Sequence, residues 1–239
     1  MAKNIGLVGG FVGRFGNAVG YTNRGRQLIR VYQPKVYNPN TKRQQLTRER
    51  FRILNNIARE AATAINIGYN RVLPGFTRQA FVGGNMNLRT FIDADSERIN
   101  STALQFSDGP LPAPTSGGVT VSGTQITVAL SGDANVLGYD ADGTPMYVGA
   151  IAIAYPQDVK LGDKGIAFKM GSVMGSAVSQ VPSSVSIPDI SEWSGTSVEV
   201  WVFWKQSAVP LNGIPVSQWP WRTPFNASPT RYAGVVDIV

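Results

Sequence analysis

Residues 6–67 read GLVGGFVGRFGNAVGYTNRGRQLIRVYQPKVYNPNTKRQQLTRERFRILNNIAREAATAINI. This stretch joins a glycine-rich, basic segment to the only long helical pattern of the chain, and the expected fold is organised around it. Six glycines fall within the first 20 residues, which disfavours a helix and permits close approach of backbones. Valines and phenylalanines lie between these glycines, so the segment is not a plain flexible linker. We therefore expect it to pack within its own domain or against a neighbouring subunit.

Residues 18–33 are typical of a β-hairpin. Residues 18–22 and 27–32 have strand character, and Asn23-Arg24-Gly25 between them has the composition of a turn. Basic and aromatic side chains are interleaved along this hairpin, namely Arg24, Arg26, Arg30, Tyr21 and Tyr32. Such side chains on strands can hold a phosphate backbone and stack on bases. The alternative is a solvated edge hairpin whose arginines prevent aggregation, and the sequence leaves both interpretations open.

A long amphipathic helix is predicted over residues 41–67, with Asn40 or Thr41 as its cap. Its first half is strongly basic, although positive charge near a helix N-terminus opposes the helix dipole. Helix stability therefore does not explain this charge, whereas a polyanionic partner would. A merely solvated face is the alternative. A second helix is predicted over residues 78–92, with Thr77 as its cap.

The hydrophobic period changes to two in the C-terminal half. Residues 109–118, GPLPAPTSGG, have the composition of a linker. Several short apolar strands follow, separated by glycine and proline turns, which predicts a β-sandwich of the immunoglobulin-like kind. Trp201 and Trp204 are expected in its core or at the rim. Trp219 and Trp221 lie in a proline-rich loop and either form an interface or fold back over the sandwich.

The composition argues against most enzyme classes. The 239 residues include no cysteine and no histidine, which removes disulfides, the usual zinc ligands and the usual general base. Asp140-Ala-Asp142-Gly143 begins like a calcium loop, but Ile151 occupies the position that needs a glutamate, so a turn is expected. No apolar run approaches the length that crosses a bilayer, and the N-terminus lacks a signal-peptide core. We expect a non-enzymatic protein without cofactor or metal, in contact with no membrane.

Charge is unevenly distributed. Residues 1–100 carry sixteen Lys/Arg and five Asp/Glu, a net charge of +11, and residues 101–239 carry six and ten, a net charge of −4. Such asymmetry indicates two regions with different partners, of which the basic one requires an anionic surface.

The order of these segments resembles an uncharacterised family from gut and environmental Bacteroidota and their phages. The family pattern combines a Gly-Gly-Phe-x-Gly element, a Pro-Lys pair and an Asn-x-x-Thr-x-x-Gln element that leads into a basic helix. The matching positions are Gly9, Gly10, Phe11, Gly13, Arg14, Gly16, Asn17, Val19, Gly20, Lys35, Asn40, Thr41, Gln44, Arg48, Arg50 and Phe51. Val31-Tyr32-Gln33, inserted before the Pro-Lys pair, departs from the pattern. The resemblance covers residues 6–92 and continues more weakly to the C-terminal VVDIV. It implies an architecture without an established activity, and the phage association favours a virion component.

These observations predict an α+β protein in three parts. Residues 1–108 would form a basic arm, hairpin and helix pair, residues 109–118 a linker, and residues 119–239 an immunoglobulin-like sandwich. The expected function is that of a non-enzymatic structural component of a bacteriophage virion, assembled in the host cytoplasm with other virion subunits. The residues expected to contact nucleic acid or acidic neighbours are Arg14, Arg24, Arg26, Arg30, Lys42, Arg43, Arg48, Arg50 and Arg52. The residues expected at interfaces are Tyr21, Tyr32, Trp219 and Trp221. The alternative function is a glycan- or protein-binding module that acts through the tryptophan loop.

Overall fold

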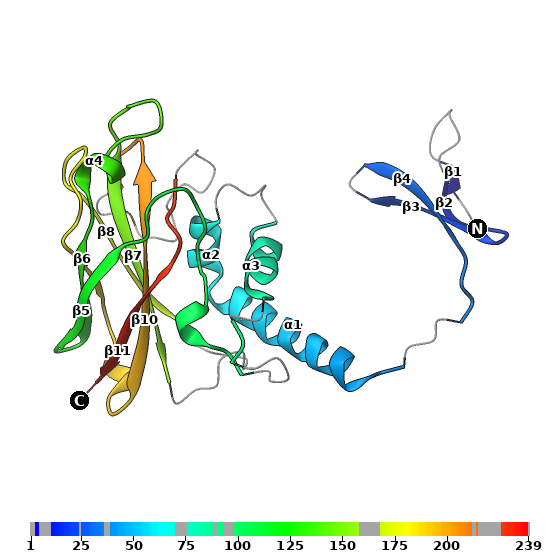
Figure 1. The fold of residues 1–239 in the computed structure, drawn as a ribbon, viewed down its shortest axis with the longest axis horizontal. Helices are drawn as coiled ribbons and strands as arrows, with labels where there is room; N and C mark the ends of the chain where they lie inside the picture. The colour runs from blue at the N-terminus through cyan, green and yellow to red at the C-terminus, as the bar shows by residue number, and fades with distance from the viewer. Residues whose placement is uncertain are drawn as a thin grey trace. The chain divides into compact units, whose positions relative to one another are not determined.

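The computed structural model describes residues 3–4, 11–23, 25–35, 39–69, 76–87, 90–92, 98–157, 168–211, 214 and 226–238. It is a mixed α+β structure with three antiparallel sheets, as the sequence predicts at this level. The chain forms two compact units, Met1–Thr41 and Lys42–Val239. Figure 1 shows the elements of each unit.

The first unit is a small antiparallel sheet with strand order β1-β2-β3-β4. Its strands are β1 (Lys3–Asn4), β2 (Phe11–Phe15), β3 (Ala18–Asn23) and β4 (Arg26–Val31). The predicted hairpin is confirmed, because Asn23 pairs with Arg26 across a two-residue turn in which Gly25 has a φ of 76°. This positive φ is readily available only to glycine. The glycine-rich segment contributes β2, which pairs with β3 and so extends the hairpin into a meander.

Three helices open the second unit. They are α1 (Lys42–Glu60), α2 (Ala62–Gly68) and α3 (Thr77–Asn85). Ile53, Leu54 and Ile57 of α1 recur at three- and four-residue spacing and are buried. The predicted second helix is shorter than expected and ends at Asn85, after Gly83 and Gly84. The buried Asn85 side chain pairs with the backbone of Gln105, accepting from its N–H at 2.9 Å and donating to its carbonyl at 2.8 Å.

Two further sheets complete the second unit, with strand orders β5-β6-β9 and β11-β10-β7-β8. The strands are β5 (Thr115–Ser122), β6 (Gln125–Ser131), β7 (Tyr147–Pro156), β8 (Lys169–Met174), β9 (Ser184–Ile187), β10 (Ser197–Ser207) and β11 (Arg231–Asp237). Short helical segments lie between the strands at α4 (Ala134–Leu137) and η2 (Ser191–Trp193), and η1 (Ser101–Ala103) precedes β5. In this unit the helices α2 and α3 lie on the side of β7 and β10 that faces away from β5 and β6 (Figure 1).

The central strands β7 and β10 are buried on both faces. Alternate residues of β10, such as Val200 and Val202, join a core shared with β6 and β9. The residues between them, Trp201 and Phe203, join a second core shared with α1, α2 and α3. Trp201 and Trp204 are fully buried, which confirms their predicted place in the core. The sandwich therefore carries the helices as a third layer.

The compact units divide the chain at a different place from the expected linker. Residues 115–118 of the predicted linker belong to β5, and Gly109 packs so tightly against Ala227 that a Cβ there would lie 2.0 Å from the Ala227 carbonyl oxygen. The helical region shares its apolar core with β7 and β10, so it cannot separate from the strands. The expected boundary at 109–118 is thus corrected to Thr41/Lys42. No helix in the described part of the chain is long and apolar enough to cross a membrane.

Candidate nucleic-acid interface

The pairing register of the first unit decides which side chains share a face. Val19 pairs with Arg14 on one side and Arg30 on the other, and two residues further along β3, Tyr21 pairs with Leu28. Paired residues point to the same side of an antiparallel sheet, and so do residues two apart in a strand. One face, here called the basic face, therefore carries Arg14, Val19, Tyr21, Asn23, Arg26, Leu28, Arg30 and Tyr32.

Two arginines of the basic face stack on its tyrosines. The guanidinium carbon of Arg14 lies 3.7 Å from the centroid of the Tyr32 ring, and that of Arg30 lies 5.8 Å from the centroid of Tyr21. The Nε of Arg14 also donates to the carbonyl of Gly16 at 3.2 Å. Cation–π stacking restrains the guanidinium groups while their N–H edges can still meet an anion. Because Arg14, Arg26 and Arg30 are all exposed, the face can neutralise several phosphates at once.

The opposite face of the same sheet carries no charged side chain among the described residues. This uncharged face consists of Gly13, Phe15, Ala18, Gly20, Thr22, Gln27, Ile29 and Val31. Its large apolar members are open to solvent within the unit, with exposed fractions of 73% for Phe15, 66% for Ile29 and 75% for Val31. The sequence analysis missed this separation of the two faces, although pairing Asn23 with Arg26 fixes the register that produces it.

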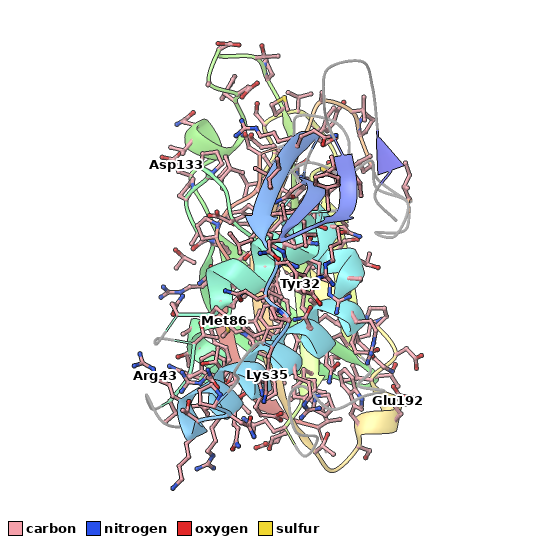
Figure 2. All side chains as sticks on the ribbon, turned by 90° about the vertical axis from the view of Figure 1, so that its right-hand side faces the viewer. Tyr32, Lys35, Arg43, Met86, Asp133 and Glu192 are labelled. Atoms are coloured by element: carbon pink, nitrogen blue, oxygen red, sulfur yellow. The ribbon has the colours of Figure 1, made fainter. Side chains whose placement is uncertain are left out.

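The basic part of α1 is a second candidate surface, in the other unit. The first two turns of the helix contain no buried residue, and Lys42, Arg43 and Arg48 are exposed there. Arg43 is labelled in Figure 2, where all described side chains are drawn. Arg52 is exposed as well, but its guanidinium forms a two-pronged ion pair with the carboxylate of Glu49, which reduces its charge toward a partner.

Arg50 does not fit the expected role. Its side chain is only 8% exposed, and its guanidinium lies 4.4 Å from the centroid of the Phe91 ring. The residue follows the helical period inward, beside Ile53 and Leu54, where α1 begins to pack on the core. The expectation that Arg50 contacts a phosphate is therefore withdrawn, because it is a packed residue of the second unit.

Three predicted site residues, Arg24, Trp219 and Trp221, lie outside the described residues. The remaining basic residues fall into two sets, one on the sheet of the first unit and one on α1 of the second. Each set is a candidate surface of its own.

The described residues contain no group of acidic side chains that could hold a metal ion. Asp140-Ala-Asp142-Gly143 forms the predicted turn, in which the Gly143 N–H donates to the Asp140 carbonyl at 2.9 Å. Among the described basic residues, Lys205 of β10 has the most strongly shifted pKa. It is 1% exposed, and its Nζ donates to the carbonyl of Ile67 at 3.2 Å. Burial lowers the pKa of Lys205 to about 7. A lysine so deeply enclosed has no route to a substrate, so we assign it to the core.

A shallow apolar groove of about 560 Å³ lies between α1 and α3. It is lined by Phe51, Val82, Gly83 and Met86, with the Arg78–Asn55 hydrogen bond of 2.9 Å at its rim. No acidic residue and no nucleophile line the groove, so we assign no catalytic role to it.

Comparison with models of protein families, with curated proteins and with solved structures finds no match to this chain.

Proposed function

We propose that this chain is a non-enzymatic structural component of a bacteriophage particle, and that its N-terminal sheet contacts packaged nucleic acid. The observation that carries the proposal is the basic face, where the described arginines of the sheet lie on one side together with both tyrosines. Residues 1–41 contain six Lys/Arg and no Asp/Glu, so no carboxylate of this segment competes with phosphate for them. The likeness of residues 6–92 to a phage-associated family favours the virion as the setting.

The arrangement of the face suits a polyanion whose bases are accessible. Arginine edges pair with phosphate oxygens, and exposed aromatic rings stack on unpaired bases without regard to sequence. We therefore propose binding that is stronger to single strands than to duplex. The exposed Lys42, Arg43 and Arg48 of α1 would add charge that does not depend on the form of the nucleic acid.

The second unit would serve as the assembly or decoration module, and we propose that its sandwich is immunoglobulin-like. The strand order supports this. Of the seven strands described in this unit, taken in chain order, the first, second and fifth form one sheet, and the third, fourth, sixth and seventh form the other. This is the arrangement of sandwiches in which strands A, B and E face strands C′, C, F and G. The helices on the outer face would then distinguish this protein from a simple sandwich domain.

The test is the salt dependence of binding to fluorescent single-stranded and duplex oligonucleotides, measured by anisotropy with the full chain. Replacing Arg14, Arg26 and Arg30 with glutamine should remove about three phosphate contacts and reduce the slope of log affinity against log salt by about 2–3. Phe15→Gln on the uncharged face is the matched control and should leave the slope unchanged. Binding that is absent, independent of salt or insensitive to the triple substitution would exclude the nucleic-acid role.

The virion setting needs a separate observation. Mass spectrometry of purified particles should detect this chain in a stoichiometry typical of a structural subunit. Absence from particles, with the protein present in infected cells, would refute the structural role and leave the binding result standing.

A further inference from the structure

The basic face alternates between aromatic rings and positive charges along its strands. Its cross-strand rows follow one another at two-residue intervals, a distance of about 6.8 Å along a strand. Tyr32 begins the series, because its N–H donates to the carbonyl of Asn17 and so continues the pairing of β3 with β4. The rows that follow hold, in order, Arg14 and Arg30 on either side of Val19, then Tyr21 with Leu28, then Asn23 with Arg26. Aromatic and cationic rows therefore alternate over the length of the hairpin.

An extended single strand of nucleic acid presents the same alternation. Its phosphates carry the charge, and its bases project from the sugars between them. On a strand that lies along β3 and β4, the phosphates would meet the arginine rows, and a base would lie over the aromatic row between them. A duplex keeps its bases stacked inside, so it could use the arginine rows only.

The two tyrosines of the face are not equivalent. The guanidinium carbon of Arg14 lies 3.7 Å from the centroid of the Tyr32 ring, so one side of that half-buried ring is occupied. Tyr21 is 38% exposed, and Arg30 lies 5.8 Å from its centroid, near the limit of a cation–π contact. The Tyr21 ring is therefore the one that is placed to receive a base.

We propose, building on the proposed nucleic-acid role, that Tyr21 stacks on one base of a single strand and that Tyr32 is a positioning residue that holds Arg14 for a phosphate. The surroundings of Arg14 support the second role. Its Nε donates to the carbonyl of Gly16, which has a φ of 56° in the turn between β2 and β3, and its guanidinium lies over Tyr32. The two Nη groups then remain for phosphate oxygens.

The test compares a short oligothymidine with a strand of the same length that carries abasic sites in place of its bases, by anisotropy with the full chain. The wild type should bind the strand with bases about 5- to 100-fold more tightly, the contribution of one stacked base. Tyr21→Leu should abolish this ratio and leave the salt slope unchanged. The matched control is Thr22→Val, the next residue of β3 on the uncharged face, which should change neither.

The outcomes separate this inference from the proposed function. Equal binding of both strands by the wild type, with affinity that falls as salt rises, would overturn the inference and leave the nucleic-acid role standing. So would a Tyr21→Leu variant that keeps the ratio. No binding of either strand would overturn both.

The positioning role of Tyr32 is measured by a double-mutant cycle with Arg14. Tyr32→Leu should weaken binding of both strands equally, by about 2- to 5-fold, and Arg14→Gln should cost less in this background than in the wild type. Tyr32→Phe keeps a ring beneath the guanidinium and should bind as the wild type does. Additive losses, or a changed ratio between the two strands in Tyr32→Leu, would overturn this role.

Photochemical cross-linking supplies a measurement on the unsubstituted chain, so it does not depend on how the variants fold. A strand that carries one 5-iodouracil should attach to Tyr21, in the tryptic peptide that begins at Phe15. Tyr32 lies in a separate peptide, from Val31 to Lys35, and should remain unmodified. Attachment at Tyr32, or only at residues of the second unit, would overturn the assignment while leaving the binding of nucleic acid in place.

Discussion

Replacing Lys205 with methionine should stabilise the protein and flatten its pH dependence. Lys205 is 1% exposed, and burial lowers the pKa of its amine from 10.5 to about 7. A difference of three to four pH units between the unfolded and folded values corresponds to a cost of about 5 kcal/mol when the amine is protonated in both states. Methionine has a similar length without the charge, but its introduction removes the polar contacts of the amine, among them the hydrogen bond to the Ile67 carbonyl, a loss of about 1–3 kcal/mol. The net gain in the free energy of unfolding at pH 7 should be about 2–4 kcal/mol.

The sign of the pH dependence follows from the depressed pKa. Between pH 7 and 10.5 the unfolded chain retains the Lys205 proton while the folded chain releases it, so the free energy of unfolding rises with pH in this window. The slope approaches about 1.4 kcal/mol per pH unit, and below pH 7 this contribution is constant. Burial raises the pKa of the Tyr69 hydroxyl, which makes the folded state lose stability once the unfolded tyrosine ionises near pH 10. Measurements should therefore stay between pH 7 and 9.5.

The assay is urea unfolding followed by tryptophan fluorescence at several pH values in that window. Val202→Ala, a cavity-forming change in the same strand, is the control and should lower stability by a similar amount at every pH. A wild-type curve that is flat or falls between pH 7 and 9.5 would refute the reasoning. So would a Lys205→Met variant that keeps the wild-type slope.

Three further substitutions test the packing of the second unit. Gly171→Ala should destabilise the protein by about 1–3 kcal/mol in urea unfolding, because the new Cβ would lie 1.9 Å from the backbone oxygen of Ser186; unchanged stability would contradict this close approach of β8 and β9. Gly83→Ala should raise the free energy of unfolding by about 0.5–1 kcal/mol, because nothing lies within 4 Å of the added Cβ in α3; a loss of stability would show that the helix is not formed as described. Arg50→Gln should cost about 1–2 kcal/mol through the lost stacking on Phe91 and leave oligonucleotide affinity unchanged, and weaker binding in anisotropy would return Arg50 to the interface.

Local signals predicted much of the structure. The hairpin of residues 18–33, the alternating strands after residue 119 and the three- to four-residue period of α1 are local signals, and these elements are present, although the helix predicted over residues 41–67 is divided at Ala61 into α1 and α2. The end of α3 at Asn85 was not predictable in this way. Gly83 and Gly84 weaken the helix locally, but the hydrogen bonds of the Asn85 side chain to the backbone of Gln105 involve a partner twenty residues away.

The sequence predicted which segments carry the basic residues of the candidate site, but only partly which of these side chains are exposed. The described basic residues of the hairpin, Arg26 and Arg30, are exposed as expected, together with the rest of β4. Arg50 belongs to the same run of charge in the sequence, but the helical period turns it inward onto Phe91. Net charge counts the charged residues of a segment but does not say where their side chains point. The direction of a side chain depends on its position in the repeat of the helix or strand that carries it.

The helical third layer of the second unit could have been predicted from the apolar pattern of the two central strands. Residues 147–156 and 198–204 are apolar or small at every position except Glu199, without the polar alternation of a strand that faces water on one side. Such continuous runs are characteristic of strands covered on both faces. A two-sheet sandwich can cover only one face of β7 and β10, so the other face requires a partner, which apolar residues of α1, α2 and α3 supply. Burying Ile151, Ile153 and Trp201 in one core with residues of α1, α2 and α3 makes the helical region and the sandwich one unit, distinct from the acid-free segment before Lys42.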